Sequence, residues 1–318
     1  MKNSNKNTSM KKQNMETMQN KPIELTPIYG LGEGIAIVPF IFDGIQLNMI
    51  LDSGAFNNML DERVFNILET RTTMKKIQED NQLFGFEGNT FDTSFRTEMK
   101  IELGNHIFDT SFIVTQINEL QALCEQFQIQ IHGFLGHEFI VKNELILDYS
   151  QSAIYINNFI TPKTDMPDGL VEMGPLYGLT KGVPVAIVKF EDIQLQMLVD
   201  TGASGNLLDE RVFNQISEIK KTKKISQDRS VMGFGGSKSN KISQTKLNIT
   251  LGEQQYDTKL FLLPHIQSFE VIISSTGIML HGVLGNEFLF ENGLILDYSR
   301  GMIYTRKTSL ETEHNRAE

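Results

Sequence analysis

Short apolar runs separated by turn residues make up most of the chain. Ile35–Phe42 and Ile45–Leu51 are two such runs, and Asp43-Gly44 between them is a strong signal for a tight hairpin turn. Met99–Leu103 and Ile107–Val114 flank another turn in the same way. Many short strands, with turn signals about every 8 to 12 residues, are typical of an all-β fold.

Helical signals are few and short. Asp61 is a good N-cap for a helix through Leu68, and the apolar residues of Ile117–Phe127 recur at helical spacing. One further helical turn is expected at Glu138–Val141. Three more strands are predicted to complete this half of the chain: Ile131–Leu135, Leu145–Asp148 and Ala153–Ile156.

The chain contains the same pattern twice. Ile45–Phe65 and Ile193–Phe213 are identical at 14 of 21 positions, and His132–Ile156 and His281–Thr305 at 15 of 25. Two lobes related by an internal duplication therefore follow. The predicted organisation is a tail at 1–22, a first lobe at 23–160, a linker at 161–170, a second lobe at 171–306 and a tail at 307–318.

Each copy carries an aspartate where an apolar strand runs into a small polar turn. The first copy reads Leu51-Asp52-Ser53-Gly54-Ala55 and the second Val199-Asp200-Thr201-Gly202-Ala203. Glycine permits unusual backbone angles, and the hydroxyl can bond neighbouring backbone groups. We expect Asp52 and Asp200 to meet across the interface between the two lobes.

Two further segments follow each aspartate in the same order. The first is rich in glycine, and the second ends an apolar run on Leu-Gly, as in Leu135-Gly136 and Leu284-Gly285. The glycine-rich segments consist of Gly85, Phe86, Glu87 and Gly88 in the first copy, and Gly233, Phe234, Gly235 and Gly236 in the second. With the aspartate motifs, these segments resemble the aspartic peptidases, specifically the retropepsin-like group.

That resemblance implies two barrel-like lobes around a pseudo-twofold axis, with a peptide-binding cleft between them. Asp52 and Asp200 would share a proton and activate one water against a peptide bond, with no metal and no other cofactor. The glycine-rich segments would be flaps over the substrate. Ser53 and Thr201 would brace the two loops across the axis; the alternative is that each only caps its own turn.

Composition and net charge exclude several classes of binding partner. A net charge of -10 argues against nucleic acid or an anionic membrane surface, and no apolar run reaches the length of a membrane span. The lone Cys124 excludes an internal disulfide, and the first 22 residues lack the apolar core of a secretion signal. We expect a monomeric, cytoplasmic protein that acts on a peptide or protein substrate.

Several repeated residues permit other interpretations. His132 and His281 recur at matched positions, but the histidines lack ligand spacing, which favours a structural role over a metal or base role. Asp61 and Asp209, with the arginines two positions later, indicate helix starts and ion pairs. Asp148-Tyr149 and Asp297-Tyr298 are interpreted as turn residues.

The sequence departs from the retroviral pattern at two places. Phe56 and Ser204 stand where retroviral members carry acidic residues, and His137 and Asn286 replace their arginine. Both halves of that charged pairing are absent together. Two non-catalytic alternatives therefore stay open: a peptide-binding module on the same scaffold and a structural dimer unit.

Overall fold

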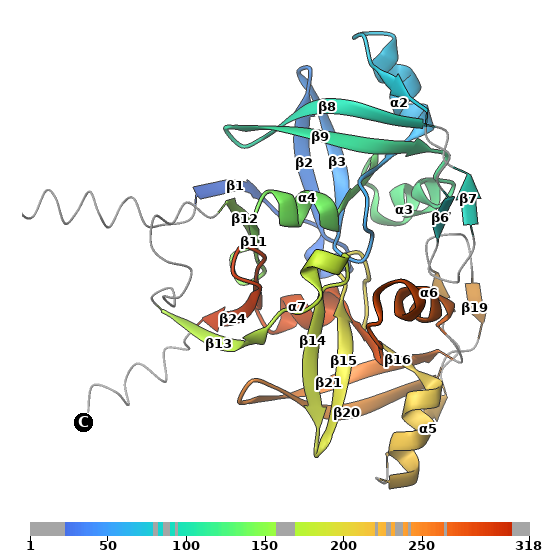
Figure 1. Ribbon diagram of the computed structural model, residues 1–318, viewed down its shortest axis with the longest axis vertical. Coiled ribbons are helices and arrows are strands. Elements are labelled where there is room, and N and C mark those ends of the chain that lie inside the picture. The colour runs from blue at the N-terminus through green and yellow to red at the C-terminus, as the bar shows by residue number, and fades with distance from the viewer. Residues whose placement is uncertain are drawn as a thin grey trace, which may run out of the picture.

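The computed structural model describes residues 23–78, 82–84, 90–92, 95–156, 169–219, 222–226, 230–232, 238–240, 243–263 and 266–306. Two lobes face each other, one built from each copy of the repeat (Figure 1).

Each lobe is a closed barrel of six strands. In the first lobe the ring closes by pairing between its first and last strands, and its order is β2 (Ile37–Phe42), β3 (Ile45–Asp52), β10 (Gly133–Gly136), β4 (Met59–Asp61), β9 (His106–Thr115) and β8 (Phe95–Leu103). The second lobe repeats this order with β14 (Val185–Phe190), β15 (Ile193–Val199), β22 (Gly282–Leu284), β16 (Leu207–Asp209), β21 (Gln254–Leu263) and β20 (Ser243–Leu251). Short strands β5 (Lys76–Ile77) and β17 (Ile225–Ser226) extend the two sheets at β8 and β20. The predicted all-β, two-lobe fold is confirmed.

A third sheet joins the lobes. Its order is β1 (Ile23–Pro27), β12 (Ala153–Ile156), β11 (Leu145–Asp148), β23 (Ile295–Asp297), β24 (Met302–Arg306) and β13 (Leu170–Pro175). The central pair β11–β23 crosses from one lobe to the other, with Leu147 opposite Leu296. The sequence analysis assigned 145–148 and 153–156 to the first lobe alone. Their strands are present, but they belong to this shared sheet, because each lobe's own barrel closes without them.

The helices are short and lie at the ends of strands: η1 (Leu31–Glu33), α2 (Glu62–Glu69), α3 (Glu119–Phe127), α4 (His137–Lys142), η2 (Leu179–Lys181), α5 (Glu210–Ile219), α6 (Gln267–Thr276) and α7 (Asn286–Glu291). The predicted N-cap of α2 is confirmed, since Asp61 Oδ1 accepts the Arg63 N–H at 2.9 Å. Helix α3 begins two residues later than expected. Ile117 precedes the N-cap, Asn118, and its N–H donates to Asp61 Oδ2 at 3.1 Å.

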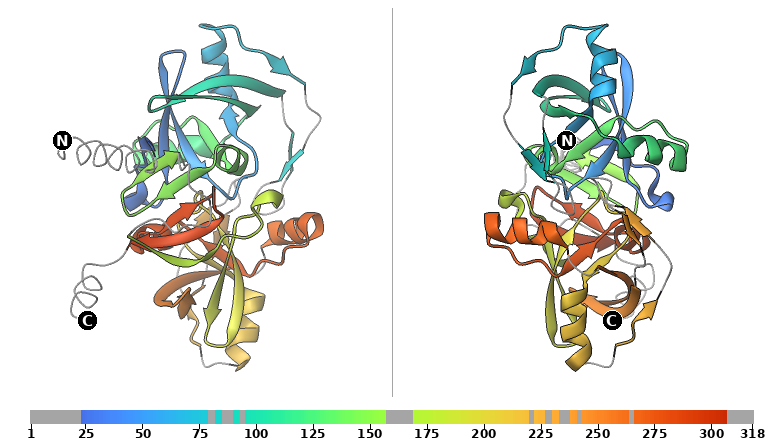
Figure 2. Two further views of the ribbon diagram at one scale, coloured as in Figure 1. Left: turned by 60° about the vertical axis from the view of Figure 1, so that its left-hand side comes forward. Right: turned by 90° about the vertical axis from the view of Figure 1, so that its right-hand side faces the viewer.

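Each glycine-rich segment lies between two antiparallel strands. They are β6 (Gln82–Phe84) with β7 (Thr90–Asp92), and β18 (Ser230–Met232) with β19 (Lys238–Asn240). Both pairs lie on the side of the molecule away from the shared sheet (Figures 1 and 2). The predicted flap residues Gly85, Phe86, Gly88 and 233–236 lie outside the described residues, so their role stays a prediction.

One apolar cluster runs through both barrels into the shared sheet. Leu51 and Val199, which precede the two aspartates, belong to it, as do the buried Tyr149 and Tyr298. Burial of each large side chain contributes about 1.5 to 3 kcal/mol. The strands that deliver the aspartates are therefore anchored in the core. In the described part of the chain, no helix is long and apolar enough to cross a membrane.

Candidate active site

Asp52 and Asp200 meet at the boundary between the lobes. Asp52 is the last residue of β3, and Asp200 directly follows β15. A Cβ placed on Gly54 would lie 2.6 Å from Asp200 Cγ, and one placed on Gly202 would lie 2.6 Å from Asp52 Oδ1. The glycine of each loop therefore packs against the carboxyl of the other loop.

The reason for glycine here differs from the one expected. From sequence, unusual backbone angles are the expected reason for Gly54 and Gly202. Neither residue is among those with positive φ. Glycine is required because a methyl group would occupy the position of the opposite carboxyl, so close approach rather than backbone freedom decides the residue.

Backbone N–H groups orient each carboxylate within its own loop. Asp52 Oδ1 accepts from Gly54 at 3.0 Å and from Ala55 at 2.9 Å. Asp200 Oδ1 accepts from Gly202 at 2.8 Å and from Ala203 at 3.2 Å. These bonds fix the carboxyls without a charged side chain as partner.

Ser53 and Thr201 lock the two loops together by reciprocal bonds. The Ser53 N–H donates to Thr201 Oγ1 at 2.8 Å, and the Thr201 N–H donates to Ser53 Oγ at 3.0 Å. Each hydroxyl then donates across the axis, from Ser53 to Val199 O at 2.7 Å and from Thr201 to Leu51 O at 2.8 Å. Both residues are fully buried. These are the cross-axis bonds anticipated from the resemblance, not caps of separate turns.

Burial raises the pKa of both carboxyls, and the charge of Asp200 raises the pKa of Asp52 further. The N–H groups of Gly202, Ala203 and Gly54 oppose the rise at Asp200. Two adjacent carboxyls in this position cannot both ionise at low cost, which favours a state with one shared proton. Such a pair can accept a proton at one oxygen and donate one at another.

Leu-Gly segments lie beneath the loops, as expected. A Cβ on Gly136 would lie 2.9 Å from Ala55 O, and one on Gly285 would lie 2.7 Å from Ala203 O. Two buried asparagines that the sequence analysis did not assign hold these glycines. Asn58 Oδ1 accepts the Gly136 N–H at 2.8 Å, and Asn206 Oδ1 accepts the Gly285 N–H at 3.0 Å. Asn58 and Asn206 occupy matched positions in the two copies, and this repetition is the sequence signal that could have identified them.

The Asp-Tyr pairs lie at turns, as interpreted: Tyr149 and Tyr298 are turn residues directly after β11 and β23. Asp148 is indeed a turn residue, since its Oδ1 accepts the Gln151 N–H at 3.0 Å. Tyr149 and Tyr298, however, are buried in the core, where Tyr149 contacts Asn286 and Tyr298 contacts His137 from the opposite lobe. A side-chain pattern of aspartate and tyrosine after a strand cannot reveal such a long-range contact.

The positions that depart from the retroviral pattern make uncharged contacts between the lobes. A Cβ on Gly182 would lie 2.6 Å from Phe56 Cε2, and one on Gly34 would lie 3.0 Å from Ser204 Cβ. His137 Nε2 bonds the Leu179 carbonyl at 2.8 Å. Close packing against glycine thus replaces the missing charged pairing.

The repeated histidines are structural. His132 Nδ1 accepts the Asn48 N–H, and His281 Nδ1 accepts the Gln196 N–H, each at 2.9 Å. Asp61 and Asp209 pair with Arg63 and Arg211, as expected at helix starts. Among the described residues, no three His, Cys, Asp or Glu side chains are grouped in a way that could hold a metal ion.

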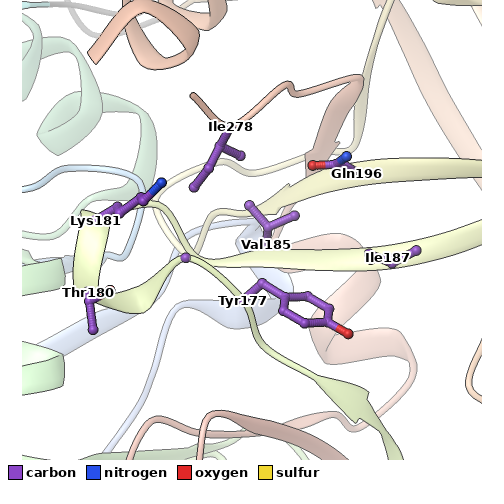
Figure 3. A pocket seen from close by; sticks show the side chains of 8 residues that line it. Tyr177, Thr180, Lys181, Val185, Ile187, Gln196 and Ile278 are labelled. Atoms are coloured by element: carbon purple, nitrogen blue, oxygen red, sulfur yellow. The ribbon is translucent and has the colours of Figure 1, made fainter. Parts of the chain in front are cut away.

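A separate hollow of about 400 Å³ lies on the second lobe beside η2 (Figure 3). Its lining includes neither aspartate and consists of Tyr177, Gly178, Thr180, Lys181, Val185, Ile187, Gln196 and Ile278. It is therefore distinct from the dyad.

One known protein family matches part of this chain. The model of the aspartyl protease family matches residues 185–288, which contain Asp200 and all six strands of the second barrel. No curated protein matches the chain. The first lobe repeats the matched strands in the same order and supplies the second aspartate.

Proposed function

We propose that this chain is a retropepsin-like aspartyl protease, an endopeptidase that hydrolyses peptide bonds with a water activated by Asp52 and Asp200. The observation that carries the proposal is the reciprocal packing of Gly54 on Asp200 and Gly202 on Asp52. This arrangement brings two carboxyls together from separate lobes. A scaffold that only binds peptides has no need for it.

The reaction uses the pair as one acid and one base. In the proposed resting state the pair holds one proton, which we place on Asp52, and Asp200 carries the charge. Asp200 takes a proton from water, whose oxygen attacks the peptide carbonyl carbon, while Asp52 donates its proton to the carbonyl oxygen. The product of this step is a neutral gem-diol.

Collapse of the gem-diol restores the starting state. Asp200 gives its proton to the leaving nitrogen as the carbon–nitrogen bond breaks, and Asp52 takes a proton from one gem-diol hydroxyl. The products are a carboxylic acid and an amine. General acid–base catalysis of this kind contributes roughly a hundred- to ten-thousand-fold to the rate.

The remaining parts of the site have supporting roles in this proposal. The loops are held by Ser53 and Thr201, so the carboxyls need little reorganisation during the reaction. The glycine-rich segments that follow β6 and β18 would act as flaps over the bound peptide, as the resemblance implies. Since one chain supplies both aspartates, the active unit would be a monomer.

The test is incubation of the full chain with an unfolded protein at mildly acidic and at neutral pH, with and without a statine-type transition-state mimic. We expect fragments that disappear when the mimic is present. Tight binding of the unfolded protein without cleavage at either pH would instead support the non-catalytic peptide-binding module.

A further inference from the structure

The residues that follow Gly136 and Gly285 differ between the two lobes. His137 stands in the first lobe and Asn286 in the second, at matched positions of the repeat, and both are buried. Each is close to a tyrosine of the opposite lobe, which follows the strand at the centre of the shared sheet. The two pairs are Asn286 with Tyr149 and His137 with Tyr298.

The pair in the second lobe is connected to the Asp200 loop. The Tyr149 hydroxyl donates to Asn286 Oδ1 at 2.9 Å, and Asn286 Nδ2 donates to the Thr201 carbonyl at 2.6 Å. Tyr149 is only 1% exposed and Asn286 is fully buried, so solvent does not compete for these bonds. Tyr149, which follows β11, is thus linked through Asn286 to the backbone carbonyl of Thr201, the residue after Asp200.

The carbonyl that Asn286 binds belongs to a functionally important peptide group. Thr201 C=O and Gly202 N–H lie in one planar trans peptide unit, on opposite sides of it. Gly202 N–H donates to Asp200 Oδ1 at 2.8 Å. A bond that fixes the direction of the carbonyl therefore fixes the direction of the N–H. It also polarises the peptide group and strengthens that N–H as a donor to a carboxylate.

The matched pair in the first lobe does not make the same connection. His137 bonds the Leu179 carbonyl through Nε2, at 2.8 Å, and its ring meets that of Tyr298 edge-on. The Ser53 hydroxyl of the Asp52 loop donates to Val199 O at 2.7 Å. In the described part of the protein, neither the Tyr298 hydroxyl nor His137 Nδ1 has a hydrogen-bond partner.

We infer that Asn286 and Tyr149 are a positioning pair that holds the Asp200 carboxylate in its ionised state through the Thr201–Gly202 peptide group. The inference rests on the proposed function, because it assigns Asp200 as the base. It makes the two lobes unequal: the Asp200 loop receives a buried hydrogen-bond chain that the Asp52 loop lacks. The duplication thus yields a dyad in which one aspartate is favoured as the base.

The matched variants Tyr149→Phe and Tyr298→Phe test this inference, because they remove the same atom from equivalent places. In Tyr149→Phe we expect kcat to fall on the order of tenfold, with KM within about twofold of wild type, since only the orientation of the reacting carboxyl changes. The acidic limb of the pH profile should move to higher pH, because Asp200 becomes harder to ionise. Tyr298→Phe should leave both quantities near wild type. Equal changes in the two variants, or none in Tyr149→Phe, would overturn the inference.

A second readout does not depend on cleavage. Titration of the aspartate carboxyls, followed by ¹³C NMR of labelled full-length protein, should show a raised pKa for the dyad in Tyr149→Phe but not in Tyr298→Phe. Asn286→Leu, which removes both bonds of the asparagine, should shift it in the same direction and at least as far. If wild type cleaves nothing and these shifts are observed, the positioning pair stands and the proposed function fails. If wild type cleaves and the titrations are unchanged, the positioning pair fails alone.

Discussion

The α-carbon of Gly54 packs directly against the carboxyl of Asp200, so that a Cβ at residue 54 would lie 2.6 Å from Asp200 Cγ. The same contact joins Gly202 to Asp52 in the other direction. Real Cβ atoms do not approach other heavy atoms this closely. The two glycines therefore keep space for the two carboxyls to lie side by side.

Gly54→Ala should displace the Asp200 carboxyl and reduce kcat by roughly a hundredfold, since a shift of about 1 Å at a reacting group can have that effect. Gly202→Ala should do the same through Asp52. Gly32→Ala is the control, because a Cβ there meets nothing within 4 Å. Steady-state kinetics of the three variants, with circular dichroism to verify folding, provide the check. Wild-type turnover in Gly54→Ala would contradict the contact.

Removing the Thr201 hydroxyl should weaken the association of the two lobes. Thr201→Val keeps the shape of the side chain but leaves the buried Ser53 N–H and Leu51 carbonyl without their partner. An unsatisfied buried polar group costs about 1 to 3 kcal/mol, so a loss of that order in the free energy of unfolding is expected. Thr201→Ser retains the hydroxyl and should lose much less. Denaturant unfolding measures both, and equal stability of Thr201→Val and wild type would rule out the brace.

His137 should make the protein less stable in mild acid. Burial lowers its pKa, although the bond to the Leu179 carbonyl opposes that shift. The unfolded chain therefore binds the proton more readily, and stability falls as pH decreases from about 6.5, the unperturbed histidine value, through the folded-state pKa.

Burial also lowers the pKa of His132 and His281, whose effect has the same sign. The raised pKa of Asp52 acts in the opposite sense, because the folded state then holds the proton more tightly in acid. His137→Asn, which copies the second lobe, should therefore reduce the slope of stability against pH below 6.5 without removing it. Thermal unfolding from pH 7.5 to 5 tests this, and an unchanged slope would show that His137 does not titrate in this range.

Specific activity should not fall on dilution. Both aspartates and both halves of the brace come from one chain, so the site is complete without a second copy. Activity per mole measured over a thousandfold concentration range, with sedimentation at the upper end, tests this. Loss of activity at low concentration that is regained on concentrating the protein would show that a dimer is required.

The repeat made much of the fold predictable from sequence. Two copies of an apolar strand that ends in aspartate, serine or threonine, and glycine predict two equivalent strands and loops, and the structure has β3 and β15 there. The N-cap at Asp61 was also readable, because capping depends on residues close in sequence. Local signals of this kind need no knowledge of the tertiary structure.

Features that depend on contacts between the lobes were not predictable. The strands at 145–148 and 295–297 carry the same residues in both copies, and nothing in either copy shows that they pair with each other. Tyr149 is a turn residue, as predicted, but its side-chain partner, Asn286, lies 137 positions away and no local pattern indicates it. The role of Gly54 was likewise misassigned, since the carboxyl that excludes a side chain belongs to the other lobe.

The central claim is that Asp52 and Asp200 act as one catalytic unit, and substitution of each by asparagine tests it most directly. Asparagine keeps the shape but cannot exchange a proton with water, so both Asp52→Asn and Asp200→Asn should lose roughly ten-thousand-fold or more in peptide cleavage while remaining folded. The double variant should be scarcely less active than either single one, because the two groups work together. Cleavage of an unfolded protein substrate by the three variants, measured against wild type, is the decisive comparison. Activity within about tenfold of wild type in either single variant would contradict the shared dyad.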